Sequence, residues 1–277
     1  MECAKEILKV TQIPSIPETL KAIIQATNNP NVNSSHLEKL VIRDAGISLR
    51  LLKMVNSSYY SLPQRVKSIK QAIVLLGFSA VKNIASGLAM IETFGRMDKI
   101  DQNYVGMIWN HSLTVSRFTQ IFNKMSGLKT SDDVMMAGMV HDIGHLIMNR
   151  HFESDYRALL DKNCFFPSVD EEMMRFSIDH AALGGVLMEE WKFAPAVVDL
   201  VRNHHCAIDT YKGNVSEISR LMLADKLAEN LYASDKFFED HTDCPQSISA
   251  ITKVAGLVWE VMRAKAPLFT EAMAYGF

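Results

Sequence analysis

Apolar residues recur at helical spacing along almost the whole chain, and this periodicity limits the possible folds more than any other feature of the sequence. Residues three and four positions apart share one face of an α-helix, so each such stretch predicts a helix with a buried stripe. Alternating runs of β-branched and aromatic residues, and the Asn-Gly or Asp-Gly turns that join paired strands, are absent from the 277 residues. The sequence therefore predicts an all-α fold.

Helix ends are marked by residues with a capping role. Ser35 and Glu38 have the spacing of a capping box, and Ser68 precedes the apolar run IKQAIVLL, which Gly77 ends. Further helix ends are expected at Pro30, Pro63 and Gly127. Short helices joined by Pro, Asn and Ser turns give way to longer ones beyond GRMDKIDQN. We therefore expect an N-terminal short-helix lobe over residues 1–97 and a second helical lobe, with C-terminal helices, over residues 98–277.

Composition limits the protein's class and location. Hydrophobic residues make up 48% of the chain, ample for a buried core. No stretch reaches the roughly 18 apolar residues of a membrane span, and the first ten residues do not resemble a signal peptide, so we expect a cytoplasmic protein. The net charge of −2, without long Lys/Arg clusters, argues against a nucleic-acid-binding surface. Four separated cysteines without a C-x-x-C pair predict reduced thiols.

Histidines are concentrated in the second half of the chain. Six of the nine lie in apolar or small-residue surroundings, at His111, His141, His145, His180, His204 and His205. The carboxylates of Asp142 and Asp225 belong with them by context. A single buried histidine is more often hydrogen-bonded than a ligand, but burying the whole set without partners would cost about 1–3 kcal/mol per group. A metal removes that cost for all of them, and imidazole with carboxylate suits the first-row divalent ions Mn, Fe, Co, Ni and Zn.

Two of these positions have competing interpretations. Adjacent His141 and Asp142 point about 100° apart on a helix, so both reach one ion only if other helices supply the remaining ligands. Asp225 lies among apolar neighbours and is expected to need a cation. The alternative is an exposed Asp225 that pairs with Lys226 or Arg220. His145, four residues after His141, is a ligand, a proton donor to a leaving group, or a hydrogen-bonded core residue.

The order of these residues resembles a known signature. His111, His141-Asp142 and Asp225 resemble the H…HD…D pattern of the HD superfamily, helical metal-dependent phosphohydrolases. The segments FSIDHAALGGVLMEEWKFAPAVVDLVRNHH, IPSIPETLKAIIQATNNP and ISLRLLKMVNSSYYSLPQRVKSIKQAIVLLGF are similar to the HDOD domain, an HD-related output domain of bacterial signalling proteins. The resemblance covers about residues 10–230.

The resemblance implies one or two divalent metal ions. His111, His141, Asp142 and Asp225 match the first metal site of the superfamily. The second metal site of its HD-GYP branch corresponds to His180, His204 and His205. Asp142 would be the ligand that bridges the two sites. His145 stands where HD-GYP proteins carry a lysine, and CAIDTYKG replaces their GYP motif, which weakens any expectation of cyclic di-GMP hydrolysis.

Two functions follow from the resemblance. The favoured one is a signal-transduction module that acts on a protein partner in trans, with NSSYYSLP (residues 56–63) as the segment where that partner is expected. The alternative is a metal-dependent phosphohydrolase for a small phosphorylated ligand, with Asp142 and His145 as catalytic candidates and Arg150 and Arg202 near the phosphates. A redox-sensing di-iron centre also fits the histidine-rich set. Gly184 and Gly185 are expected to let another helix approach closely, not to bind phosphate.

Overall fold

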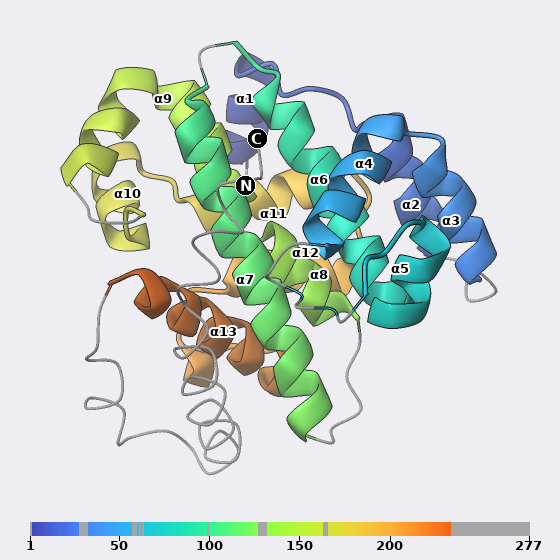
Figure 1. Ribbon diagram of the computed structural model, residues 1–277. Coiled ribbons are helices and arrows are strands. Elements are labelled where there is room, and N and C mark those ends of the chain that lie inside the picture. Colours follow the sequence, from blue (N-terminus) through green and yellow to red (C-terminus); the bar gives the residue numbers. More distant parts are fainter. Residues whose placement is uncertain are drawn as a thin grey trace. The chain divides into compact units, whose positions relative to one another are not determined.

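The computed structural model describes residues 2–233 except 28–32, 57–59, 61, 63, 99, 127–131 and 163–165. These residues form α-helices and one short 3-10 helix, and no β-strand occurs among them (Figure 1). The prediction of an all-α fold is confirmed. The described chain divides into two compact units, one of them Pro14–Trp109 and the other made of residues 2–13 and 110–233. The expected lobe boundary at residue 97 stays a prediction, and the expected C-terminal helices beyond residue 233 lie outside the described residues.

The Pro14–Trp109 unit, here called the short-helix unit, is arranged around one apolar helix. Its helices are α2 (Glu18–Thr27), α3 (Ser34–Ile42), α4 (Ala45–Val55), α5 (Ile69–Leu76) and α6 (Phe78–Gly95). Helix α6 packs against each of the other four. Every residue from Ala80 to Ile91 is buried, as expected for a helix that is covered on all sides.

The other unit, here called the site unit, contains the histidines singled out above. Its elements are α1 (Glu2–Val10), most of α7 (Gln102–Ser126), α8 (Asp133–Val140), α9 (Ile143–Lys162), α10 (Val169–Phe176), α11 (His180–Glu190), α12 (Pro195–Asn203), the 3-10 helix Ile208–Thr210 and α13 (Val215–Ala233). Helix α11 packs against α1, α9, α10 and α12, and α8 packs against α12 and α13. These contacts bring segments distant in sequence to one place.

The predicted helix ends are confirmed in part. The Ser68 side chain caps α5 by accepting a hydrogen bond from the Gln71 N–H at 3.1 Å, and the helix ends at Gly77, whose φ of 92° favours glycine. The predicted capping box at Ser35 is wrong, because Asn33 caps α3 and accepts from the His36 N–H at 3.0 Å. Asn and Ser are similarly good N-caps, so sequence alone does not rank two candidates so close together. Pro30, Pro63 and Gly127 lie outside the described residues.

No helix in the described part of the chain combines the length and the apolar character needed to cross a bilayer. Cys3 and Cys206 are free thiols, and the other two cysteines lie outside the described residues.

Candidate metal centre

All seven predicted metal ligands lie in the site unit, and the structure brings them together. They come from five segments: His111 from α7, His141 and Asp142 from the junction of α8 and α9, His180 from the first turn of α11, His204 and His205 from the end of α12, and Asp225 from α13. Two groups of four share Asp142. We call His111, His141, Asp142 and Asp225 the first cluster, and Asp142, His180, His204 and His205 the second cluster.

The His141-Asp142 pair occupies a break between two helices. Helix α8 ends at Val140 and α9 begins at Ile143, so the continuous apolar run of the sequence is interrupted at these two polar residues. The break also depends on Gly144. A Cβ atom on Gly144 would lie 1.9 Å from the carbonyl oxygen of His180, so only glycine allows the start of α9 to lie against the start of α11.

Three of the four contacts in the first cluster have the spacing of atoms that surround one ion, and the fourth, between His111 and Asp225, is a direct hydrogen bond. His111 Nε2 lies 2.8 Å from Asp225 Oδ1 and 3.3 Å from Asp142 Oδ2. His141 Nε2 lies 3.3 Å from Asp142 Oδ2 and 3.4 Å from Asp225 Oδ1. Ligand atoms that share an ion at about 2.1 Å are about 3.0–3.4 Å apart at ordinary coordination angles. All four residues are buried.

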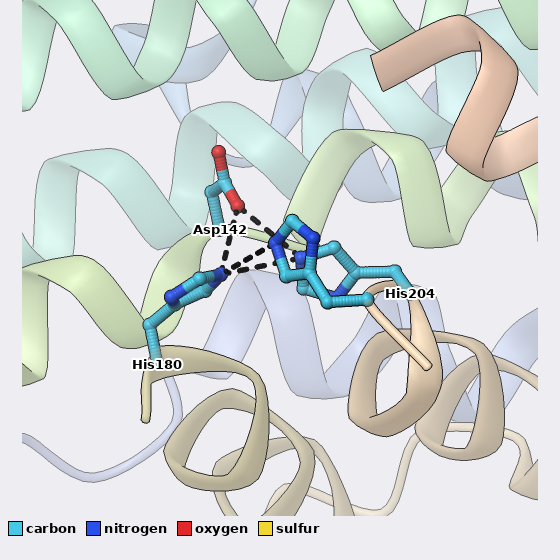
Figure 2. Close-up of side chains that lie close together, drawn as sticks. Asp142, His180 and His204 are labelled. Atoms are coloured by element: carbon cyan, nitrogen blue, oxygen red, sulfur yellow. Dashed lines mark hydrogen bonds and ion pairs between the residues drawn. The ribbon is translucent and has the colours of Figure 1, made fainter. Parts of the chain in front are cut away.

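The second cluster gathers around the other oxygen of Asp142. His180 Nε2 lies 3.6 Å and His204 Nε2 3.5 Å from Asp142 Oδ1. His180 Nε2 also lies 3.3 Å from His204 Nε2 and 3.0 Å from His205 Nε2. Figure 2 shows the Asp142, His180 and His204 side chains pointing toward one another. Because Asp142 turns Oδ2 to the first cluster and Oδ1 to the second, it stands where a bridging carboxylate would.

Hydrogen bonds behind three of the rings determine which nitrogen faces the clusters. His141 Nδ1 donates to the Gly138 carbonyl oxygen at 3.1 Å, His204 Nδ1 donates to the Val201 carbonyl oxygen at 2.7 Å, and His180 Nδ1 donates to a Glu172 carboxylate oxygen at 2.7 Å. A neutral ring that donates through Nδ1 presents a bare lone pair at Nε2. Metal-binding histidines are usually supported in this way.

The fit to a cation can be tested on two buried nitrogen contacts. The Nε2 atoms of His180 and His204 face each other at 3.3 Å, and in neutral rings held through Nδ1 neither carries a hydrogen to share. His141 Nε2 is buried 3.3 and 3.4 Å from two carboxylate oxygens, where a neutral ring with a bare Nε2 would need a cation between these atoms. Both arrangements suit a cation between the ligand atoms, so the residues fit a first-row divalent ion.

The charges of the first cluster give the same result. Burial would raise the pKa values of Asp142 and Asp225, but nearby histidines outweigh it and hold both well below their usual range. Burial opposes charge on His141, yet these two carboxylates raise the pKa of His141 to about 10. Two buried negative charges therefore attract a positive one. In the absence of metal the His141 imidazolium supplies it, and a divalent ion would take its place.

The alternative interpretation of Asp225 is wrong. Asp225 is buried beside His111, while Lys226 pairs with Glu229 at 2.8 Å and Arg220 donates to Asn123 at 2.8 Å. That Asp225 and the six other predicted residues bind metal stays a prediction.

His145 and the two arginines expected near phosphates have partners outside the two clusters. His145 Nδ1 lies 2.5 Å from the Tyr156 hydroxyl, which agrees with a hydrogen-bonded core residue, and its Nε2 lies 3.9 Å from Asp142 Oδ1. Arg150 pairs with Glu153 at 3.3 Å and Arg202 with Glu189 at 3.0 Å. Both arginines therefore have acidic partners, the commoner arrangement for surface arginines.

Sequence reasoning missed Glu172 and Tyr156, which are fully buried behind the second cluster. Glu172 follows Glu171, the residue that forms the capping box of α10 with Ser168. The spacing Ser168-x-x-Glu171 explains the first glutamate and leaves the second unexplained. A glutamate without a capping role beside an apolar stretch is the feature from which a buried Glu172 could have been predicted.

Comparison with known proteins gives a family and a fold. The HDOD domain family matches residues 13–207. An HDOD domain protein of unknown function from Geobacter sulfurreducens has a TM-score of 0.77 at 21% identity, covering 99% of this chain and 97% of that one. A Marinobacter aquaeolei protein named as a candidate signal transduction protein has a TM-score of 0.75 at 20% identity, covering 96% of this chain and 60% of that one. At these identities the structures support the fold alone.

One relative by sequence is longer than this chain. An uncharacterized protein of Treponema pallidum is 25% identical over 222 residues, covering 76% of this chain. The chain spans 42% of that protein's length.

Proposed function

This chain belongs to the HDOD domain family, and from that premise we propose that it is a signal-transduction module whose buried centre binds one or two first-row divalent ions and whose output is contact with a partner protein. The convergence of the first and second clusters on Asp142 carries the proposal. Potential metal-binding atoms from five chain segments lie close together there. Bound ions would therefore cross-link α7, the α8–α9 junction, α11, α12 and α13.

Burial supports a regulatory role for the first cluster. All four of its residues are buried, so an ion held there would be enclosed by protein. An ion that binds only the folded state stabilises it, and this stabilisation grows with the logarithm of the free ion concentration above Kd. Metal loading would therefore change the stability of the site unit, and a partner that recognises this unit would respond to it. The segment NSSYYSLP, the expected partner contact, falls in the sequence range of the short-helix unit and would be a separate contact from one on the site unit; its residues 57–59, 61 and 63 lie outside the described residues.

A second candidate function, phosphohydrolysis, is favoured by the second cluster. His205 is exposed, so this cluster has a ligand at the surface where a small phosphorylated molecule can approach. Bound divalent ions polarise a phosphoryl oxygen and lower the pKa of bound water toward about 7. Asp142 would hold ions through both oxygens, and His145 lies beside it as a candidate proton donor. Phosphate binding by Arg150 or Arg202 would require breaking the ion pairs with Glu153 and Glu189.

One experiment separates the two functions. Wild type and Asp142→Ala are supplied with Mn, Fe(II), Ni or Zn and assayed on phosphomonoesters, nucleotides and cyclic dinucleotides, while thermal unfolding is followed in parallel. The regulatory function predicts that ions raise the Tm of wild type and not of Asp142→Ala, with no turnover by either. Turnover by wild type that disappears in Asp142→Ala would overturn this preference. Cyclic di-GMP is expected to stay uncleaved, because the lysine and GYP motif of HD-GYP proteins are replaced here.

A further inference from the structure

The Glu172 side chain, on α10, accepts hydrogen bonds from residues of α9 and α11. Its Oε2 atom accepts from the His180 backbone N–H at 2.8 Å and from His180 Nδ1 at 2.7 Å. Its Oε1 atom accepts from the Tyr156 hydroxyl at 2.6 Å and lies 3.2 Å from His145 Nδ1. Glu172 is fully buried, so both oxygens of this carboxylate are occupied by donors from inside the protein.

Tyr156 reaches this network only because α9 is kinked. In a continuous helix, residues 145 and 156 would lie about 16 Å apart along the axis, at about 1.5 Å per residue. That separation is too long for a hydrogen bond between His145 and Tyr156. Glu153 has φ 41° and ψ −111° within α9, which interrupts the helix and turns the chain back. The kink is thus what places the Tyr156 hydroxyl beside His145.

The direction of each hydrogen bond follows from Glu172. A carboxylate only accepts, so the Tyr156 hydroxyl donates to it, and the remaining contact of that hydroxyl must be donated by His145 Nδ1. His180 Nδ1 donates to the same carboxylate directly. The two rings stack at 3.8 Å with 19° between their planes, and both turn Nε2 toward Asp142 Oδ1.

We propose that Glu172 is a positioning residue that holds His145 and His180 in the Nδ1–H tautomer, so that both present Nε2 lone pairs to the second cluster. His180 is held directly and His145 through Tyr156. This inference rests on the proposed function where it concerns metal, because the second cluster is expected to hold an ion. The tautomers themselves do not depend on metal.

A third ion among His145, Glu172 and His180 would be the alternative explanation of this group, since their ligand atoms also lie close together. It does not suit the contacts. Both Glu172 oxygens already accept hydrogen bonds, and His180 Nδ1 is a donor in this network. The group is satisfied by its own hydrogens, in contrast to the facing Nε2 atoms of His180 and His204.

Only a carboxylate can hold both rings in this way. A glutamine at position 172 would keep one accepting oxygen and place an NH₂ donor where the other had been. The His180 backbone N–H donates to this side chain and cannot reverse, so the amide oxygen stays toward His180 and the NH₂ group faces Tyr156. There the hydroxyl accepts from the NH₂ group and donates to His145 Nδ1, so His145 changes tautomer. Glu172→Gln therefore forces His145 out of the Nδ1–H form at almost constant side-chain volume.

The test combines nitrogen NMR of the histidine rings with zinc titration of the full chain. Glu172→Gln is compared with wild type and with Glu171→Gln, a matched control that alters the adjacent glutamate and retains a residue suited to the capping box. Tyr156→Phe removes only the hydroxyl through which Glu172 holds His145. His204→Ala identifies the zinc-binding step that belongs to the second cluster.

The expected result has two parts. In metal-free wild type and Glu171→Gln, His145 and His180 both carry hydrogen on Nδ1, whereas in Glu172→Gln His145 carries it on Nε2 and His180 keeps it on Nδ1. Glu172→Gln weakens zinc binding at the second cluster by about 10- to 100-fold, the usual loss when a supporting carboxylate is removed. The first cluster keeps its affinity. Tyr156→Phe leaves the tautomer of His180 unchanged.

Two outcomes are decisive against the positioning role. Unchanged tautomers of both rings in folded Glu172→Gln would overturn it, as would equal losses of zinc affinity in Glu172→Gln and Glu171→Gln. A wild-type protein that binds no zinc would contradict the proposed function. The NMR comparison on metal-free protein would still decide the role of Glu172.

Discussion

The two clusters share Asp142 but differ in charge and in support. The first contains two buried carboxylates, and the His141 imidazolium offsets one of their two charges when no ion is bound. The second has only the other oxygen of Asp142, three imidazoles, and an exposed member in His205. Attraction between an ion and its ligands grows with ligand charge and falls with solvent exposure. The two metal positions are therefore expected to be unequal. The first cluster should bind an ion more tightly, and the second cluster should exchange its ion more readily.

Asp142→Asn should have the largest effect, because it removes the residue that both clusters share. Metal binding at both positions is expected to be lost. The metal-free protein should lose about 1.5–3 kcal/mol of unfolding free energy, because the His141 imidazolium loses one of its two charged partners while Asp225 still balances its charge. Urea unfolding and metal titration measure these effects. Asp155→Asn is the control, since Asp155 forms an exposed pair with Arg175 worth about 1 kcal/mol or less. Full retention of one ion by Asp142→Asn would show that the clusters are independent.

Gly144→Ala should act through sterics instead of charge. The added methyl would meet the His180 carbonyl oxygen at 1.9 Å, so the starts of α9 and α11 must separate. We expect a loss of about 1–3 kcal/mol or more in stability, together with weaker metal binding. Gly95→Ala is the matched control, because the nearest atom to a Cβ there lies 3.5 Å away. Equal stability of the two variants would contradict the close approach.

Asp225→Asn and His205→Ala should separate the two clusters. Asp225→Asn removes charge from the first cluster only, so its ion should be lost while the second ion still binds. His205→Ala should weaken only the second ion, and should change unfolding free energy by less than about 0.5 kcal/mol because His205 is exposed. Calorimetric titration with zinc measures both effects. The same titration curve for both variants would be incompatible with two unequal positions.

Glu153→Gly should have the smallest effect on stability. It tests whether the kink of α9, which places Tyr156 beside His145, is a strained position. Glycine in a helix usually costs about 1 kcal/mol, but at φ 41° it also relieves the strain of a side chain. We therefore expect little change in the unfolding midpoint. Asp155→Gly, two residues further along α9, should show the full cost. If Glu153→Gly is the more destabilised of the two, the kink is not a strained position.

The helices and the seven clustered residues were predictable because both depend on local pattern and residue type. Helical periodicity reflects the stripe that each helix must bury, and the spacing of histidines and aspartates resembles a known ligand set. The close approach expected at Gly184 and Gly185 is confirmed, since a Cβ on Gly185 would lie 2.9 Å from Arg202 Cβ of α12.

The supporting network was not predictable for a physical reason. Tyr156 meets His145 only because α9 kinks at Glu153, and glutamate is not a residue type from which a positive φ is predicted. Neighbouring Glu171 and Glu172 are chemically identical, and only the direction of α10 decides which is buried. Such contacts depend on tertiary structure and not on sequence spacing.

Elemental analysis of protein purified without added metal is the most direct measurement of whether the two clusters bind metal. The measurement is repeated after equilibrium dialysis against Mn, Fe(II), Ni and Zn, with Asp142→Asn alongside. We expect one or two first-row ions per wild-type chain and none in Asp142→Asn. Wild-type protein that contains no such ion and takes none up, or a metal content that Asp142→Asn shares, would contradict this expectation.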